Sequence, residues 1–176
     1  MAFFRWLREF KEEATAEFYN YVAPLLSNKK VQLLDNYIQH RNYTRLRHCM
    51  DVAYYSFLIA KFFNWDSRSA ARAGLLHDMY YTDETHSGKW QHLITHPMEA
   101  LENARSVCAL NEVEEDIILK HMWLCTVDPP RYKEGFVVTF VDKYCAIREG
   151  FTGRAHGGAY ERFPLPAAIY NTFPEE

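Results

Sequence analysis

Histidines and aspartates recur along this 176-residue chain within stretches that are otherwise apolar. Asp78 follows the run AGLL and Asp142 follows the run VVTFV, so both carboxylates are expected to be buried. Burial of a carboxylate is costly unless a cation or several hydrogen-bond donors meet it. Histidines on other helices could compensate these acids through a shared metal ion. The candidate metal ligands are His48, His77, Asp78, His96, His121 and Asp142.

The types of these side chains indicate which metal they would hold. Mixed imidazole and carboxylate ligands suit Fe, Mn, Co, Ni or Zn, with Mg as a further option. Neighbouring side chains on a regular helix point about 100° apart, so His77 and Asp78 can reach one centre only where a helix ends or distorts. Asp78 could resolve this difficulty by offering its two oxygens to two ions. The sequence therefore predicts a site for one or two divalent transition-metal ions.

Helical periodicity dominates the chain and predicts the elements that must position these ligands. A polar connection is expected over 82–93. The segment FVVTFV could form a strand by itself, but no partner strand is evident, so it is assigned to a helix. The fold class is therefore expected to be all-α, a helical bundle of about seven helices, with predicted helices over 3–26, 29–40, 44–64, 67–81, 96–110, 111–123 and 134–150.

Several residues are expected to mark the ends of these helices. Thr44 and Asn111 are predicted N-caps, because their side chains can accept a hydrogen bond from the first helical turn. Pro97 is expected at a first helical position, immediately after His96. Pro24 is expected to stop the first helix and Gly150 the last one.

The composition excludes several classes of protein. Apolar residues make up 48% of the chain, which is enough for one sizeable core. The net charge of −3 argues against nucleic acid as a partner. No apolar run is long enough for a membrane span, and no signal peptide is evident, so a cytoplasmic location is expected. The expected divisions are a packed N-terminal helix over 1–28, the metal-binding domain over 29–150 and a C-terminal tail over 151–176.

The order H…HD…H…H…D on successive helices resembles the HD-domain superfamily of metal-dependent phosphohydrolases. The resemblance covers roughly residues 29–149, and the phrases HPMEALENA and DIILKHMW look like segments of small bacterial HD proteins, including those similar to diadenosine tetraphosphate hydrolases. It implies a minimal metal site of His48, His77, Asp78 and Asp142. In binuclear members the additional histidines, here His96 and His121, hold a second metal that Asp78 bridges to the first.

The resemblance also implies an activity, which is hydrolysis of a phosphoester by a metal-bridging hydroxide. The expected substrate is a small phosphorylated molecule, either a phosphomonoester or a phosphodiester and nucleotide-like in character. Asp78 would be central to catalysis because it holds the metal bridge. The chain departs from several binuclear subfamilies at Tyr81, where they carry a lysine three residues after the HD aspartate.

Phosphate binding requires cations or donors near the metal ligands, and four side chains are candidates. For each of them a solvated surface charge is at least as good an interpretation. His92 and His96 are four residues apart, but Pro97 disfavours a helix at His96, so they are not assigned to a zinc-binding helix. The four candidates are Lys89, His92, Arg131 and Lys143.

Two other functions fit the same ligands. HD-type di-iron oxygenases use a similar set of six ligands to activate dioxygen. A metal- or nucleotide-binding module without turnover is the third alternative, although degenerate modules often lose ligands. The ligands alone do not separate the hydrolase from the oxygenase, and the sequence leaves the oligomeric state open.

Overall fold

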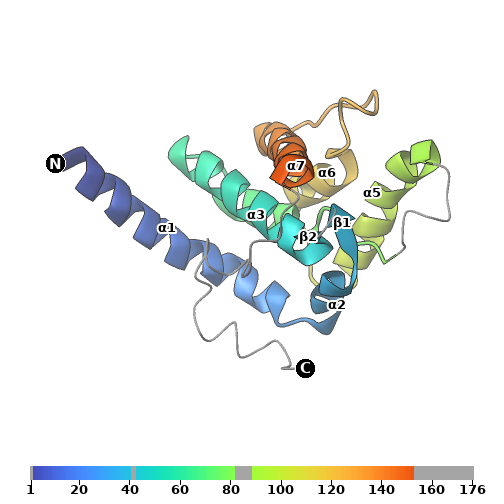
Figure 1. Ribbon diagram of the computed structural model, residues 1–176, viewed down its shortest axis with the longest axis horizontal. Helices are drawn as coiled ribbons and strands as arrows, with labels where there is room; N and C mark the ends of the chain where they lie inside the picture. Colours follow the sequence, from blue (N-terminus) through green and yellow to red (C-terminus); the bar gives the residue numbers. More distant parts are fainter. Residues whose placement is uncertain (1, 41–42, 82–88, 153–176) are drawn as a thin grey trace.

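The computed structural model describes residues 2–40, 43–81 and 89–152, without the side chains of 2–12, 40, 89–93 and 151–152. Within these residues the chain forms seven α-helices, one 3₁₀ turn and one small hairpin, which confirms the all-α prediction (Figure 1). The elements are α1 (Ala2–Leu26), α2 (Lys29–Gln32), η1 (Leu33–Asn36), β1 (Ile38–His40), β2 (Tyr43–Thr44), α3 (Arg45–Phe62), α4 (Ser67–Leu76), α5 (Lys89–Arg105), α6 (Glu112–Lys120) and α7 (Lys133–Thr152).

Helices α3 and α4 pack against each other, and α7 and α6 pack against this pair. Gly74 allows the close approach of α4 to α3, because a Cβ at this position would lie 2.8 Å from the Cα of Ala53. The ring of Phe18 in α1 contacts the rings of Tyr54 and Phe57 in α3. These apolar contacts hold the helices that carry the candidate ligands. Among the described helices, none combines the length and apolarity that crossing a membrane requires.

The predicted N-caps are confirmed at both positions. The Thr44 side chain accepts from the backbone N–H of Arg47 at the start of α3. Asn111 accepts from the backbone N–H of Glu114, whose side chain accepts in return from the backbone N–H of Asn111. This reciprocal capping box satisfies two donors that the start of α6 would otherwise leave unpaired. The cap fixes where α6 begins and therefore where its C-terminal His121 lies.

The predicted helix over 29–40 is wrong beyond its first turn. After Gln32 the chain tightens into η1, and it then extends from Tyr37 into the strand β1. Antiparallel pairing of β1 with β2 satisfies the backbone groups that a helix would have paired, and Thr44 donates to the Asp35 carboxylate beside it. A pairing partner that follows later in the chain therefore outweighs the local helical pattern.

Several predicted helix ends also differ from the structure. The helix predicted over 67–81 ends at Leu76, and tight backbone turns follow it. The helix predicted from 96 begins at Lys89, so Pro97 lies inside α5 and residues 89–93 are helical rather than part of a connection. Likewise α1 runs past Pro24, and α7 passes Gly150 to Thr152. The segment FVVTFV is helical, as predicted, and the predicted tail lies outside the described residues after the first two.

Candidate metal centre

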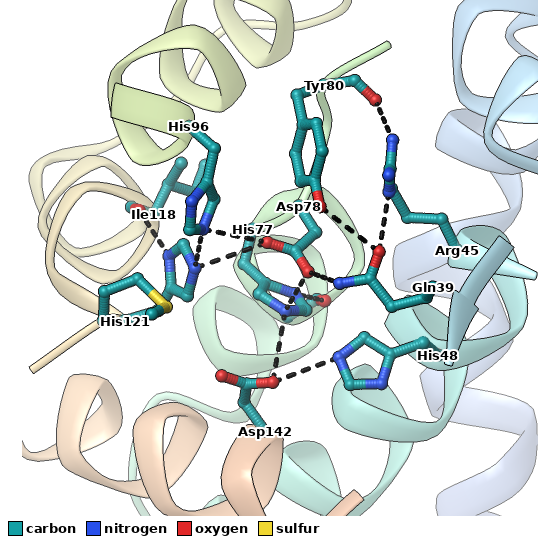
Figure 2. Close-up of polar contacts among 12 residues, drawn as sticks. Gln39, Arg45, His48, His77, Asp78, Tyr80, His96, Ile118, His121 and Asp142 are labelled. Atoms are coloured by element: carbon teal, nitrogen blue, oxygen red, sulfur yellow. Dashed lines mark hydrogen bonds and ion pairs between the residues drawn. The ribbon is translucent and has the colours of Figure 1, made fainter. Parts of the chain in front are cut away.

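The six predicted ligands meet at one buried point between the helices (Figure 2). They come from five different parts of the fold: α3, the turn directly after α4, the middle of α5, the residue that ends α6, and the middle of α7. All six residues are buried, none being more than 6% exposed. Their ligand atoms form three overlapping trios within 4.8 Å, which are His48–His77–Asp78, His77–His121–Asp142 and Asp78–His96–His121.

The Asp78 carboxylate lies between two sets of ligands. Its Oδ1 is 3.4 Å from the Nε2 atoms of both His96 and His121. Its Oδ2 is 3.5 Å from the Nε2 of His77. We call His48, His77 and Asp142 the acidic half of the site, and His96 and His121 the imidazole half. The two oxygens of Asp78 therefore face the two halves separately, which is the arrangement that a bridging carboxylate requires.

Two histidines are held with a lone pair directed at the centre. The Nδ1 of His77 is 2.8 Å from the carbonyl oxygen of Gly74, and the Nδ1 of His121 is 2.8 Å from that of Ile118. A carbonyl can only accept, so each Nδ1 donates its proton there. These acceptors are carbonyls of the last turns of α4 and α6, which no longer have helical partners. Each Nε2 is thereby left available as a metal ligand, the usual arrangement for a histidine that binds a metal.

The histidine on α3, His48, is held by a carboxylate. The Nδ1 of His48 lies 3.0 and 3.1 Å from the two oxygens of the fully buried Glu149. Its Nε2 lies 3.1 Å from the Oδ1 of Asp142. Burial lowers the pKa of His48, but the hydrogen bonds to Asp142 and Glu149 outweigh it and raise the pKa to about 10. A metal ion binding at this Nε2 would have to displace a proton.

The other charged groups respond to burial and to each other. Burial opposes ionisation of Asp78, but the neighbouring imidazoles of His77, His121 and His96 keep its pKa well below the ordinary value. Burial also opposes ionisation of Asp142, but the neighbouring imidazoles of His48 and His77 outweigh it and lower the pKa of this carboxyl. Burial lowers the pKa of His121 to about 4, although Asp78 acts in the opposite direction. The centre therefore combines ionised carboxylates with a neutral imidazole, which is the ligand state that divalent metals require.

The site also shows unmet bonding capacity of the kind that a cation would satisfy. The Nε2 of His77 and the Oδ1 of Asp78 are buried and make no hydrogen bond. The Nε2 atoms of His96 and His121 face each other at 3.0 Å. Because the other nitrogen of His121 already donates its proton, its Nε2 presents a lone pair toward the centre. Buried acceptors that converge without donors fit a divalent metal ion, and the cluster could bind one.

Three residues of the site are not indicated by the patterns considered in the sequence. Glu149 could have been predicted, because it follows Asp142 by two helical turns and so lies on the same face of α7. Gln39 donates from Nε2 to the Oδ2 of Asp78 at 2.7 Å, and Arg45 donates from Nε to the Oε1 of Gln39 at 2.8 Å. Gln39 lies on the hairpin, in a segment predicted to be helical, so no pattern placed it near the ligands.

The structure separates the candidate phosphate-binding residues. The Nζ of Lys143 lies 2.6 Å from the Oδ2 of Asp142 and 3.5 Å from the carbonyl of His121, at the edge of the metal ligands. The Arg131 side chain is 77% exposed and pairs with Asp116, which is not a candidate ligand. The structure therefore brings Lys143 to the site but places Arg131 against another acid.

The remaining candidate residues lie elsewhere or outside the described side chains. Lys89 and His92 lie on the first turn of α5, but their side chains are not described. Tyr81, at the position of the subfamily lysine, donates from its hydroxyl to the carbonyl of Lys30, away from the metal ligands. No cation is therefore supplied from this position.

Comparison with known families accounts for the arrangement as a whole. A model of the HD domain family matches residues 45–147, which include all six candidate ligands. The chain therefore belongs to the HD-domain family. Searches of curated proteins and of solved structures gave no match.

Proposed function

We propose that this protein is a metal-dependent phosphohydrolase that cleaves a phosphoester bond in a small, nucleotide-like substrate. The observation that carries the proposal is the Asp78 carboxylate, whose two oxygens face separate sets of histidine nitrogens at 3.4–3.5 Å. Membership of the HD-domain family supports the reaction class. A carboxylate shared in this way is what a binuclear hydrolytic site needs.

The chain offers ligands for two ions. The acidic half and the Asp78 Oδ2 would hold one ion, and the imidazole half and the Asp78 Oδ1 would hold the other. Divalent ions bound there would supply an activated water and would neutralise charge on the phosphoryl group. Fe, Mn, Co, Ni and Zn suit these ligands, and Mg is a further option.

The side chains around the ions have roles of their own. Burial of the ligands shields them from bulk water, which strengthens electrostatic interactions there. The Lys143 ammonium is partly exposed and lies beside Asp142, so it can donate to a phosphate oxygen of a substrate that reaches the ligands. His77 and His121 keep their orientation through backbone carbonyls and need no substrate to form the site.

The experiment that tests the function is an activity screen of the metal-loaded protein. Protein stripped of metal is reloaded with Mn, Co, Ni, Fe, Zn or Mg and assayed with chromogenic phosphomonoesters and phosphodiesters, and then with a nucleotide library. We expect hydrolysis that requires added metal and is lost in Asp78→Ala. Oxygen-dependent consumption of a substrate by an iron-loaded protein that hydrolyses nothing would contradict the proposal and favour the oxygenase. Failure to bind any metal would favour the non-catalytic module.

A further inference from the structure

The short hairpin before α3 contains one residue more on its first strand than on its second. Ile38 pairs with Thr44 and His40 pairs with Tyr43, so Gln39 is the extra residue of an irregularity in the β1–β2 pairing. Such bulges bend a strand and redirect a side chain, and they are common next to active sites. Here the redirected side chain is that of Gln39, which reaches the Asp78 carboxylate (Figure 2).

The Gln39 amide is held from behind by a buried arginine. Arg45 is 1% exposed, and its guanidinium lies 3.6 Å from the centre of the Tyr80 ring. It donates from one terminal nitrogen to the Tyr80 carbonyl at 2.6 Å and from Nε to the Oε1 of Gln39. The backbone N–H of Arg45 also donates to the carbonyl of Tyr37, which closes the hairpin behind Gln39. Arg45 thus ties the hairpin to the segment that follows Asp78.

The chemistry of these groups determines which way the amide faces. A guanidinium can only donate, so the Gln39 atom that faces Arg45 must be the oxygen. The Tyr80 hydroxyl donates to the same oxygen at 3.4 Å. The Gln39 NH₂ group therefore faces the Oδ2 of Asp78, where an ionised carboxylate accepts its hydrogen bond. If the amide were turned by half a rotation, its NH₂ group would face the donors of Arg45 and its oxygen would face the Asp78 carboxylate, so both hydrogen bonds would be lost.

We propose that Gln39, oriented by Arg45, is a positioning residue that sets the rotation of the Asp78 carboxylate and so aligns both of its oxygens for metal. This inference rests on the metal binding proposed above. The terminal torsion of an aspartate is broad and is not fixed by the backbone. The hydrogen bond from Gln39 selects one rotation, in which Oδ2 faces the acidic half and Oδ1 faces the imidazole half. A carboxylate oxygen has two lone pairs, so Oδ2 can accept from Gln39 and still bind an ion.

The hydrogen bond from Gln39 to Asp78 has a specific consequence for metal affinity. Because Asp78 is shared, loss of the Gln39 hydrogen bond must weaken metal binding at both halves together. Loss of an outer contact to a ligand of one half would weaken that half alone. A residue that only stabilised the hairpin would change the free energy of unfolding without changing the affinity of the folded protein for metal.

The test is a calorimetric titration of metal-free protein with Mn²⁺, for the wild type, Gln39→Leu and Gln32→Leu. Gln32 is the matched control, because its side-chain amide donates to the Leu26 carbonyl at 2.9 Å, at the junction of α1 and α2. Thermal unfolding in chelator establishes that both variants fold. We expect Gln39→Leu to bind Mn²⁺ about 10- to 100-fold more weakly in every binding step, the range that outer partners of metal ligands show. Gln32→Leu should bind as the wild type does.

Each other outcome overturns the inference. Wild-type affinity in folded Gln39→Leu would show that the Asp78 carboxylate needs no help from Gln39. An equal loss in Gln32→Leu would show that the effect is general destabilisation. Weakening of only one binding step would contradict the shared role of Asp78. If the wild type itself binds no Mn²⁺, the proposed function fails together with this inference, whereas a normal wild-type titration leaves only the role of Gln39 in question.

Discussion

The two halves of the metal centre contain the same kind of side chain in opposite electrostatic surroundings. In the acidic half, His48 lies between the carboxylates of Asp142 and Glu149, and despite burial its pKa is raised to about 10. In the imidazole half, His121 faces another histidine, and burial lowers its pKa to about 4. The comparison shows that neighbouring charge, and not burial alone, decides whether a buried histidine holds a proton.

This difference has consequences for metal binding. The acidic half offers an anionic ligand of its own, with a second carboxylate behind it, whereas the imidazole half has only the shared Asp78 as a source of negative charge among the described ligands. We therefore expect the acidic half to hold its ion more tightly. The imidazole half should exchange its ion more readily. Its two neutral imidazoles and one shared carboxylate oxygen compensate less of the positive charge of the ion than the ligands of the acidic half do.

The largest effect is expected where the two halves meet. Asp78→Ala removes the ligand that both halves share, so we expect a loss of metal affinity beyond the roughly 100-fold that loss of an outer partner costs. Hydrolysis should fall to background. The control is Asp116→Ala, which removes a buried aspartate that binds Lys120 and the backbone of Arg131 instead of candidate ligands. Metal content per chain, measured by mass spectrometry after dialysis, checks the prediction, and retention of metal by Asp78→Ala would refute it.

A change confined to the acidic half should leave the other half intact. Glu149→Leu removes the acceptor of the His48 Nδ1–H, so the ring loses its orientation and its basicity. We expect one binding step to weaken by about 10- to 100-fold while the other keeps its affinity. Glu149→Gln retains an acceptor at the same position and should recover part of the loss. Titration calorimetry resolves the two steps, and equal weakening of both would break the division into halves.

The role of Lys143 is separate from metal binding in either half. Lys143→Met removes a partly exposed ammonium at the edge of the site, and a hydrogen bond to a charged group contributes about 1.5 kcal/mol at the low end. We expect KM for a phosphorylated substrate to rise about 10-fold with the metal affinity changed little. Lys133→Met, on the exposed start of the same helix, serves as the control. A change in metal content with an unchanged KM would assign Lys143 to the ligands instead.

The smallest effect is expected from a change that affects only the fold. Asn111→Ala removes the cap of α6 and should cost about 1 kcal/mol of unfolding free energy. For a chain of this size, that corresponds to roughly 2–4 °C in Tm. Metal affinity of the folded protein should stay as in the wild type, because His121 keeps its contact with Ile118. Thermal unfolding and metal titration of the same sample together check this expectation.

The sequence predicts the ligands better than it predicts what orients them. Asp78 and Asp142 are recognisable because a carboxylate after an apolar run needs compensation wherever the helix lies. Gln39 and Arg45 have no such signal, because their role depends on a hairpin that forms only when two segments pair across the chain. Pro97 was expected to begin a helix, but the helix continues on both sides of it. Local patterns therefore locate the buried charges, whereas tertiary pairing decides the contacts that hold them.

The central claim is that the cluster is a metal centre whose two halves share Asp78. The most direct test is the metal-to-protein ratio of the wild type and of His121→Ala after reconstitution with Mn²⁺ and removal of excess ions. We predict two ions per chain in the wild type and one in His121→Ala, because the acidic half survives the loss of the imidazole half. A wild type that retains no ion, or a His121→Ala variant that retains two, would contradict the claim.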